Sequence, residues 1–250
     1  MSTIPNHSIQ YIWRKPLKRL FDEVDIASIV WFRIFFGIIM LIEVYRYFDH
    51  NWIHRYWIAT DYNFPYWPFH FLKPLAGDGM YVLFILMGIL SVFIMIGFLY
   101  RISTVLFFFS FTYMFLLEQT RYLNHFYLIV LLALVLCFIP AHRSLSVDSK
   151  LFNRIRSETI PIWCLWMLRL MVAVPFFFGG VAKINPDWLA GQPLGIWLLN
   201  DTDFPLIGRY FTEHWMILII SYSGLLLDLL IVPFLLFKRT RIWAFIIGFL

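Results

Sequence analysis

The chain has 250 residues, of which 61% are hydrophobic, 21% are aromatic and only 14% are charged. Soluble domains average about half apolar and about a quarter charged residues, so this composition excludes an ordinary soluble protein. The formal net charge of +5 does not indicate nucleic-acid binding, because Lys and Arg stand beside apolar runs, where the positive-inside rule accounts for them. Cys137 and Cys164 both fall inside apolar runs and predict neither a disulfide framework nor a metal site.

Long apolar runs follow one another along the chain, and a run of about 20 apolar residues is typical of a membrane-spanning helix. The sequence therefore predicts an all-α fold, a polytopic transmembrane helical bundle with six full spans and the start of a seventh. The predicted ranges are roughly 28–48, 80–100, 102–117, 122–139, 163–183, 215–237 and 241 onward. The third range is short and suits a tilted hairpin partner of the second. The last run stops at Leu250, so we expect the chain to be the membrane part of a longer protein.

The distribution of Lys and Arg predicts the orientation. With a cytoplasmic N-terminus, twelve basic residues fall in inside segments and five in outside segments. The inside set is Arg14, Lys15, Lys18, Arg19, Arg101, Arg143, Lys150, Arg154, Arg156, Lys238, Arg239 and Arg241. The outside set is Arg55, Lys73, Arg121, Lys183 and Arg209. Because cytoplasmic loops carry excess Lys and Arg, we expect a multi-pass integral membrane protein with its N-terminus in the cytoplasm, in the inner or plasma membrane if bacterial.

Two long outer segments, about 49–79 and 184–214, are rich in Trp, Tyr, Phe and Pro. Aromatic rings at this density favour the membrane–water boundary. The segments are either interfacial loops lying on the bilayer or a lid over a pocket that opens outward, and the sequence leaves both readings open. His50, His54 and His70 are scattered through the first segment, where no helix is assured to bring them together, and we expect no metal site.

Three ionisable side chains lie inside predicted spans, where an unpaired charge is costly. Arg33, Arg169 and Asp228 all fall toward the cytoplasmic ends of their spans. We expect them to form a structural ion-pair cluster, with a direct functional role as the alternative. Glu43 and Arg46 are three residues apart, a spacing that suits a local ion pair on one helix.

The stretch FFFGGVAKINPDW ends an apolar run with Lys183. Lys183 closes the fifth span and Asn124 and His125 open the fourth, so topology alone gives all three the same outer depth. A lysine at such a place often snorkels to lipid headgroups, and a histidine there is often only interfacial. However, Gly179 and Gly180 remove side chains one turn before Lys183, which leaves room for another backbone or a flat ligand.

The same stretch also supports a chemical reading. Phe176, Phe177 and Phe178 surround the lysine with apolar surface, and burial penalises the charged form of an amine. A neutral Lys183 would serve as a general base. Asn124 could then donate a hydrogen bond to an oxyanion.

Three stretches resemble the vitamin K-dependent gamma-glutamyl carboxylase family. They are LYRISTVLFFFSFTYMFLLEQTRYLNHFYLIVLLAL (99–134), FFFGGVAKINPDWLAG (176–191) and GLLLDLLIVPFLLF (224–237). The resemblance runs from about Asp25 to Leu250 and covers the membrane half of the family's architecture. It implies a carboxylase-like transmembrane domain over residues 1–250, of a bacterial type, with the family's extra-membrane domain outside this chain.

The resemblance implies a lyase that uses reduced vitamin K, a naphthohydroquinone, with O2 and CO2 as co-substrates and no metal. The quinone is oxygenated to its epoxide, and the strong base formed removes a γ-proton from a glutamyl side chain, which takes up CO2. Lys183 is implied as the initial base, and Asn124 and His125 as the pair that stabilises the quinone oxygens. Phe178, Gly179 and Gly180 are expected beside the quinone. The expected partners are membrane lipids, an isoprenoid quinone and a glutamate-containing protein.

One position departs from the family's pattern, since Ala182 stands where the family has the first of two adjacent lysines. The family's extra-membrane domain helps to bind the glutamyl substrate, so epoxidation is the part of the activity expected from the membrane half. The alternative comes from a different class of protein. It is a non-enzymatic membrane protein that binds quinone or lipid, or that scaffolds a partner.

Overall fold

The computed structural model describes residues 18–60 and 62–249. Arg14 and Lys15, which entered the count of basic residues, lie outside the described residues. The chain divides into two compact units, one reaching to Leu168 and the other running from Arg169 to Leu250.

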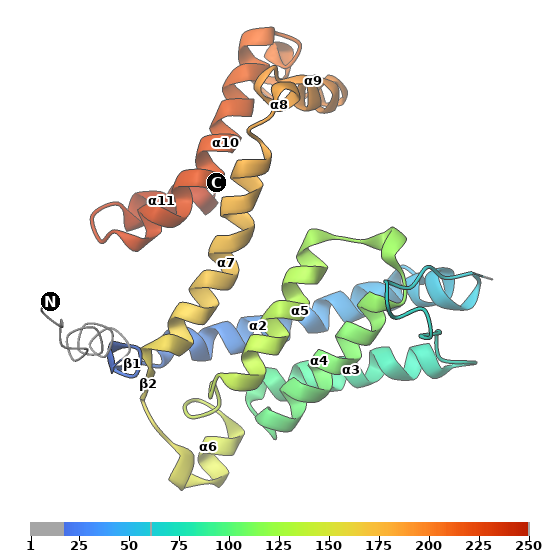
Figure 1. Ribbon diagram of the computed structural model, residues 1–250, viewed down its shortest axis with the longest axis vertical. Helices are drawn as coiled ribbons and strands as arrows, with labels where there is room; N and C mark the ends of the chain where they lie inside the picture. Colours follow the sequence, from blue (N-terminus) through green and yellow to red (C-terminus); the bar gives the residue numbers. More distant parts are fainter. Residues whose placement is uncertain (1–17, 61, 250) are drawn as a thin grey trace, which may run out of the picture. The chain divides into compact units, whose positions relative to one another are not determined.

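The first unit holds four long helices, several short ones and a two-stranded sheet (Figure 1). The strands are β1 (Glu23–Asp25) and β2 (Thr159–Pro161), which pair antiparallel with Val24 opposite Ile160. The long helices are α2 (Ala27–Asp49), α3 (Gly79–Ile96), α4 (Tyr100–Leu116) and α5 (Asn124–Phe138). The short ones are η1 (His54–Ile58), η2 (Gln119–Arg121), α6 (Val147–Leu151) and η3 (Asn153–Ile155).

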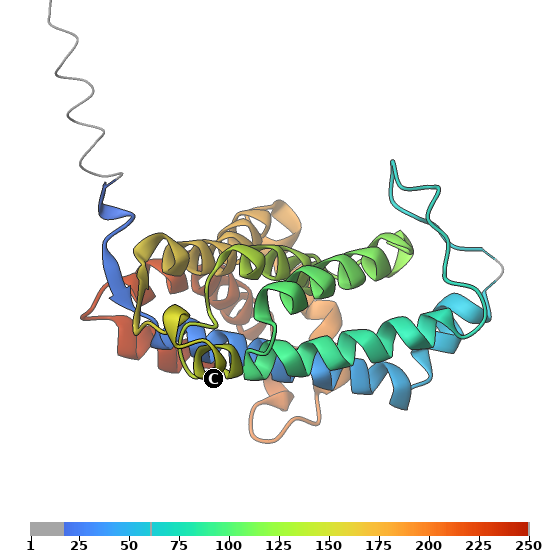
Figure 2. The same ribbon diagram turned by 90° about the horizontal axis from the view of Figure 1, so that it is seen from below.

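Small residues bring α2 and α3 together, and the two helices lie side by side in both ribbon views (Figures 1 and 2). A Cβ added at Gly37 would lie 2.7 Å from the Cβ of Met95 and 2.7 Å from the carbonyl oxygen of Ser91. At Gly88 a Cβ would lie 3.4 Å from Val44. Lipid gives little drive for helices to associate, so van der Waals packing at small residues is a main source of contact energy.

A buried arginine ties the turn between α3 and α4 to the loop after α5. Arg33 is 0% exposed, and its Nη2 donates a hydrogen bond of 2.6 Å to the carbonyl oxygen of Leu145. Gly97 ends α3 with a positive φ of 66°, which favours glycine, and its Cα faces the Arg33 guanidinium. Asp148 stabilises the same turn, because its carboxylate accepts a hydrogen bond of 2.8 Å from the backbone N–H of Leu99.

The second unit contains most of α7 (Ile162–Ala182) and the elements that follow it. These are α8 (Pro186–Leu189), α9 (Gln192–Leu198), η4 (Leu199–Asp201), η5 (Gly208–Tyr210), α10 (His214–Leu236) and α11 (Arg241–Phe249). α8 and α9 pack against α10, and α11 packs against the other end of it (Figure 1).

The predicted helices all form, with ends within four residues of the predicted ranges. Among the described residues, four helices are long and apolar enough to cross a membrane, namely α2, α3, α7 and α10. α4 and α5 are apolar but have 17 and 15 residues, short of the roughly 20 that a span needs. The all-α membrane fold is therefore confirmed, while the predicted count of six full spans is not.

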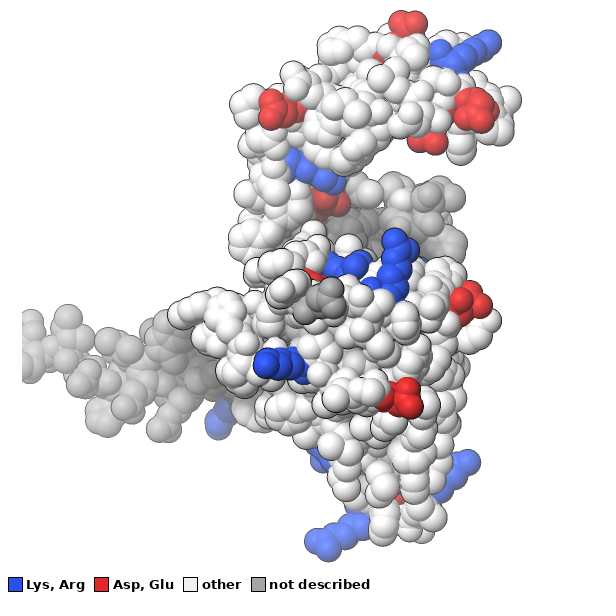
Figure 3. Space-filling model, turned by 90° about the vertical axis from the view of Figure 1, so that its right-hand side faces the viewer, with Lys and Arg blue, Asp and Glu red and all other residues white. Residues whose placement is uncertain are grey.

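Large apolar side chains cover the outer faces of these helices. Exposed fractions reach 57% at Ile39, 62% at Val82 and 63% at Phe109. On the face shown in Figure 3, Lys, Arg, Asp and Glu are few and most of the surface is uncharged. Such a surface would be a liability in water but fits contact with lipid acyl chains. The protein is an integral membrane protein.

Candidate active site

Lys183 forms an ion pair with Asp228 in the second unit. Its Nζ lies 2.7 Å from Oδ2 of Asp228, and the two side chains are only 24% and 18% exposed. The same Nζ lies 3.5 Å from the carbonyl oxygen of Gly224 and 4.9 Å from the ring centre of Trp188. An amine and a carboxylate at this distance form a charge-assisted hydrogen bond.

The glycines before Lys183 make this contact possible. A Cβ at Gly179 would lie 3.2 Å from Oδ2 of Asp228, and one at Gly180 would lie 2.6 Å from the Leu229 side chain. The space is filled by α10, whose Asp228 and Leu229 side chains lie nearest and whose backbone approaches at Gly180, 3.2 Å from the Leu229 nitrogen. A quinone-binding role for Phe178, Gly179 and Gly180 stays a prediction. Phe178 is 62% exposed on α7.

The segment after Lys183 folds back along α10. Asn185 caps α8 by accepting the backbone N–H of Trp188 at 2.9 Å, with Pro186 at the first helical position. Trp188 Nε1 then donates to the carbonyl oxygen of Ser221 at 3.0 Å. Much of the second outer segment is thus short helix lying against the first half of α10, and Lys183 meets α10 beyond its midpoint.

That arrangement contradicts the difference in depth predicted between Lys183 and Asp228. The sequence placed Asp228 in the cytoplasmic half of its span and Lys183 at the outer boundary, yet the two are hydrogen-bonded. The prediction assumed that α7 and α10 span the same depth, with their ends aligned. Instead, α7 ends part-way along α10, because α8 and α9 occupy the remaining length.

An apolar pocket of about 180 Å³ lies between α7, α10 and α11. Val172 and Phe176 line it from α7, Leu227 and Ile231 from α10, and Ala244 from α11. Leu227 directly precedes Asp228 in α10, but neither Asp228 nor Lys183 lines the pocket. A hollow with this lining accepts hydrocarbon and offers no partner for a polar group.

Asn124 and His125 belong to the first unit, where they are the first two residues of α5. Both are exposed, and the His125 ring contacts the Phe126 ring edge-on at 4.8 Å. Within the described residues, neither side chain makes a hydrogen bond with the protein. Their donors and acceptors are therefore available to a ligand, as the orienting role predicted for them requires.

A carboxylate that the sequence reading overlooked fixes the turn leading to Asn124. Glu118 is 8% exposed and accepts hydrogen bonds from Asn63 Nδ2 at 3.2 Å and from the backbone N–H of Phe64 at 3.3 Å. Its other oxygen accepts from Thr120. Burial raises the pKa of Glu118, but these hydrogen bonds outweigh it and the net pKa is lowered. The sequence signal that could have identified Glu118 is an acidic residue directly after an apolar run, followed two residues later by a threonine.

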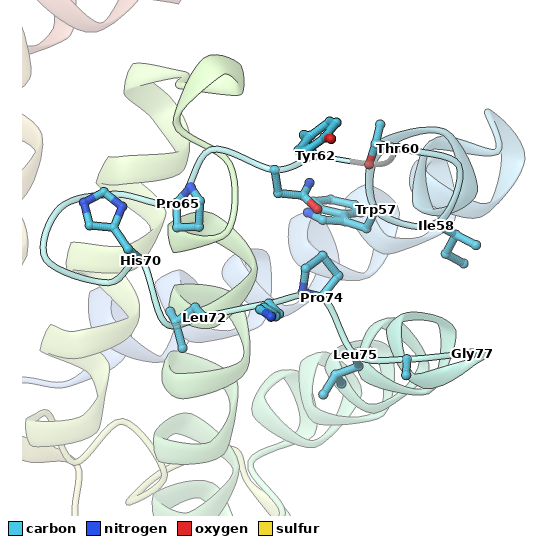
Figure 4. Close-up of a pocket in the computed structure, with 13 residues that line it drawn as sticks. Trp57, Ile58, Thr60, Tyr62, Pro65, His70, Leu72, Pro74, Leu75 and Gly77 are labelled. Atoms are coloured by element: carbon cyan, nitrogen blue, oxygen red, sulfur yellow. The ribbon is translucent and has the colours of Figure 1, made fainter.

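The first outer segment is folded around a pocket of about 500 Å³ (Figure 4). Trp57, Tyr62, His70 and Lys73 are among its lining residues, with His70 at the opposite end from Gly77. Tyr62 is 81% exposed. An aromatic segment that lines a pocket is compatible with either predicted reading, so the choice between interfacial loops and a lid stays open. Among the described residues, no group of three or more His, Cys, Asp or Glu could hold a metal ion.

The predicted ion pairs have mixed outcomes. Glu43 and Arg46 do pair, with Nη1 and Oε2 2.8 Å apart, which confirms the local pair. Within its own unit Arg33 donates to the Leu145 carbonyl oxygen, and Asp228 pairs with Lys183; the predicted cluster of Arg33, Asp228 and Arg169 stays a prediction. The Leu145 carbonyl accepts from one nitrogen of the buried guanidinium, and within the described residues Nε and Nη1 of Arg33 have no hydrogen-bond partner. Arg169 lies on α7, and its predicted role stays a prediction.

A family model for the HTTM domain, the transmembrane domain of vitamin K-dependent gamma-carboxylases, matches residues 21–250. The chain belongs to the HTTM domain family. The match begins at the end of the described N-terminal turn and includes both units. It therefore contains Asn124, His125, Lys183 and Asp228 within one HTTM domain. No solved structure matches this HTTM chain.

Proposed function

We propose that this HTTM protein is a carboxylase-like membrane enzyme that binds a reduced isoprenoid naphthoquinone and initiates its O2-dependent epoxidation. The observation that carries the proposal is the Lys183–Asp228 pair, 2.7 Å between Nζ and Oδ2, in contact with an otherwise apolar helix pair. Ionisable residues placed among membrane helices are expensive and usually functional. Here one helix supplies the carboxylate and the end of another supplies the amine.

The residues around this pair fit such a ligand. The apolar pocket of about 180 Å³ that begins at Leu227 suits an isoprenoid tail. The Trp188 ring, 4.9 Å from Nζ, offers a flat apolar wall next to the amine. When bound, the hydroquinone supplies the reducing electrons, and with O2 the balance is hydroquinone plus O2 giving epoxide plus water.

The role of the protein is to hold and move a proton. With a proton on Nζ, Lys183 is an ammonium that cannot accept another. Transfer of that proton to Oδ2 of Asp228 gives a neutral amine beside a neutral acid, with no net change in charge. A neutral pair is tolerated in a low-dielectric site, and the amine can then take a proton from a phenol as general base. Asn124 and His125 are proposed to orient the quinone oxygens.

Carboxylation of glutamyl residues is the finer part of the proposal. It adds removal of a γ-proton from a glutamyl side chain and bond formation between that carbon and CO2. Support for it comes from membership of the family and not from a described residue. Incorporation of labelled bicarbonate into a glutamate-containing peptide would measure it separately from epoxide formation.

The test is epoxide formation from reduced vitamin K in detergent, with O2 and bicarbonate supplied. General-base catalysis contributes about 10²- to 10⁴-fold, so Lys183→Ala is expected to lose at least about 100-fold in rate. Lys238→Ala is the matched control, because Lys238 is exposed just beyond the end of α10. Retention of full epoxidation by a folded Lys183→Ala protein would contradict the assignment of the base.

A non-enzymatic role in binding quinone or lipid, or in scaffolding a partner, is the second candidate. It is favoured by the completeness of the ion pair, since Lys183 and Asp228 satisfy each other without a ligand. This alternative predicts that wild-type protein binds quinone or captures a partner but forms no epoxide under any supply of O2.

A further inference from the structure

A second hollow lies in the first unit, where α5 ends, α4 begins and the chain approaches β2. Its volume is about 420 Å³. The lining is strongly basic: Arg101 comes from the first turn of α4, His142 and Arg143 from the loop after α5, and Arg154 and Arg156 from η3 and the residue after it. Pro140, Ile155 and Ser157 complete it, so no carboxylate lines the pocket.

These arginines retain most of their hydrogen-bonding capacity. Arg101 Nη1 donates to the carbonyl oxygen of Cys137 at 2.5 Å, near the C-terminus of α5. Within the described residues, none of the four arginines has a carboxylate at salt-bridge distance. The nearby acid, Asp148, is already engaged by the backbone N–H groups of Leu99 and Tyr100 at 2.8 and 2.9 Å.

His142 is a second, independent observation that indicates a ligand in this pocket. Its ring stacks on the ring of Tyr100, with centres 5.0 Å apart and planes at 23°. Its Nδ1 is buried and has no hydrogen-bond partner among the described residues. Buried polar atoms are normally satisfied, so a donor or acceptor from outside the protein is expected there.

The positive-inside rule explains why arginines occur in this segment at all. It does not explain why four guanidinium groups from three separate stretches converge on one hollow. Like charges brought together repel each other unless an anion lies between them. The planar fork of donors on arginine matches phosphate oxygens in two-point contacts. Basic pockets at the cytoplasmic ends of membrane helices are suited to lipid headgroups.

We propose that this pocket, defined by Arg101, His142, Arg143, Arg154 and Arg156, binds a phosphate group. The phosphate belongs either to the headgroup of an anionic phospholipid or to a soluble phosphate. The two sources share their chemistry and differ in whether the ligand arrives from the bilayer. The site is separate from the Lys183–Asp228 pair and does not depend on the proposed epoxidation.

The test uses the full chain and two variants of equal charge. Arg154→Gln/Arg156→Gln removes two exposed guanidinium groups from the lining, and Arg19→Gln/Lys150→Gln removes two exposed charges elsewhere in the same unit. Retention of phosphatidylglycerol over phosphatidylcholine is measured by native mass spectrometry after reconstitution into mixed vesicles. Binding of inorganic phosphate is measured by titration calorimetry on lipid-depleted protein in detergent.

If the lipid is the source, wild-type protein retains phosphatidylglycerol preferentially, and millimolar inorganic phosphate does not displace it. If soluble phosphate is the source, the calorimetric signal appears without any preference between the lipids. In either case Arg154→Gln/Arg156→Gln should weaken binding about 30-fold, from roughly fivefold for each basic group, and Arg19→Gln/Lys150→Gln should not. Equal binding by the two variants, or no binding in both assays, would overturn the proposal.

Discussion

Lys183 and Asp228 are joined by a 2.7 Å contact between Nζ and Oδ2, although 45 positions separate them in the chain. The contact unites the end of α7 with the second half of α10. Since both partners are mostly buried, removing one leaves the other without compensation. Structural and catalytic roles of the pair make opposite predictions for a variant that removes both charges together.

Replacement of the pair by Lys183→Met/Asp228→Leu separates these roles. Replacing a buried ion pair with apolar residues is often neutral or stabilising, whereas removing one partner is costly. We expect Asp228→Leu alone to lower stability by about 2 kcal/mol and the double variant to recover it, as measured by thermal unfolding in detergent. Epoxide formation should be lost in both. A double variant with wild-type turnover would show that the pair is only structural.

Gly180 is predicted to be intolerant of any side chain. Its added Cβ would lie 2.6 Å from Cδ2 of Leu229 and 3.2 Å from the Leu229 backbone nitrogen. The backbone atom cannot move as a side chain does, so α7 and α10 must separate. Gly180→Ala should lower stability by about 1–3 kcal/mol, the usual cost of overpacking, and should also reduce epoxidation by loosening the Lys183–Asp228 contact.

Gly195→Ala provides the comparison for that variant. Gly195 also lies in a helix against α10, but its added Cβ would meet only Ile217 Cδ1, at an ordinary 3.5 Å. Alanine is favoured over glycine in helices by up to about 1 kcal/mol. The melting temperature of the Gly195→Ala protein should therefore stay the same as that of the wild type or rise. A fall equal to that of Gly180→Ala would mean that close approach at Gly180 is not the cause.

The helices were predictable from sequence because apolar run length encodes them directly. The end of α3 was the least accurate, with 100 predicted and Ile96 observed. Gly97, in the left-handed conformation that commonly follows a helix, was the overlooked stop signal. The lengths of α4 and α5 were overestimated as full spans for a related reason, since the prediction assumed that each apolar run crosses the whole membrane.

The site was less predictable because its contacts depend on how elements fold back. The residues of α8 and α9 carry no sequence signal that predicts packing against α10. That packing determines that Lys183 meets α10 at Asp228. The partner of Arg33 is a backbone carbonyl, that of Leu145, which a search for opposite charges cannot find. Glu118 was not singled out from the sequence, although four hydrogen-bond contacts converge on it.

Gly97 and Gly77 form a second informative pair, since both have a positive φ, 66° and 58°. A Cβ at Gly97 would lie 1.9 Å from Nη1 of Arg33, whereas a Cβ at Gly77 would have nothing within 4 Å. Gly77→Ala should lower the free energy of unfolding by only about 1 kcal/mol, the cost of holding a residue with a side chain in the left-handed conformation. Gly97→Ala must also displace a fully buried guanidinium and should cost at least about 2 kcal/mol more. Equal losses in thermal stability would contradict the role assigned to Arg33.

His142 predicts a loss of stability in mild acid. Burial lowers its pKa from 6.5 to about 4, and the positive charge of Arg101 acts in the same direction. Between these values the unfolded chain binds a proton that the folded chain does not. Stability must therefore fall as pH decreases from about 6.5 to 4, and this contribution becomes constant below the folded pKa.

The measurement is the melting temperature of the protein in detergent from pH 7 to 4, in buffers free of phosphate so that the basic pocket stays unliganded. His142→Phe keeps the stacking on Tyr100 but cannot be protonated, so its melting temperature should decline less over this range. His54→Phe, at an exposed position of η1, controls for the loss of a histidine and should follow the wild type. The lowered pKa of Glu118 also stabilises the folded state, and this contribution begins to be lost as the pH falls below its ordinary value of 4.5, so some decline remains in every variant. If the melting temperatures of His142→Phe and the wild type fall in parallel between pH 6.5 and 5, the pKa of His142 is not lowered in the folded state.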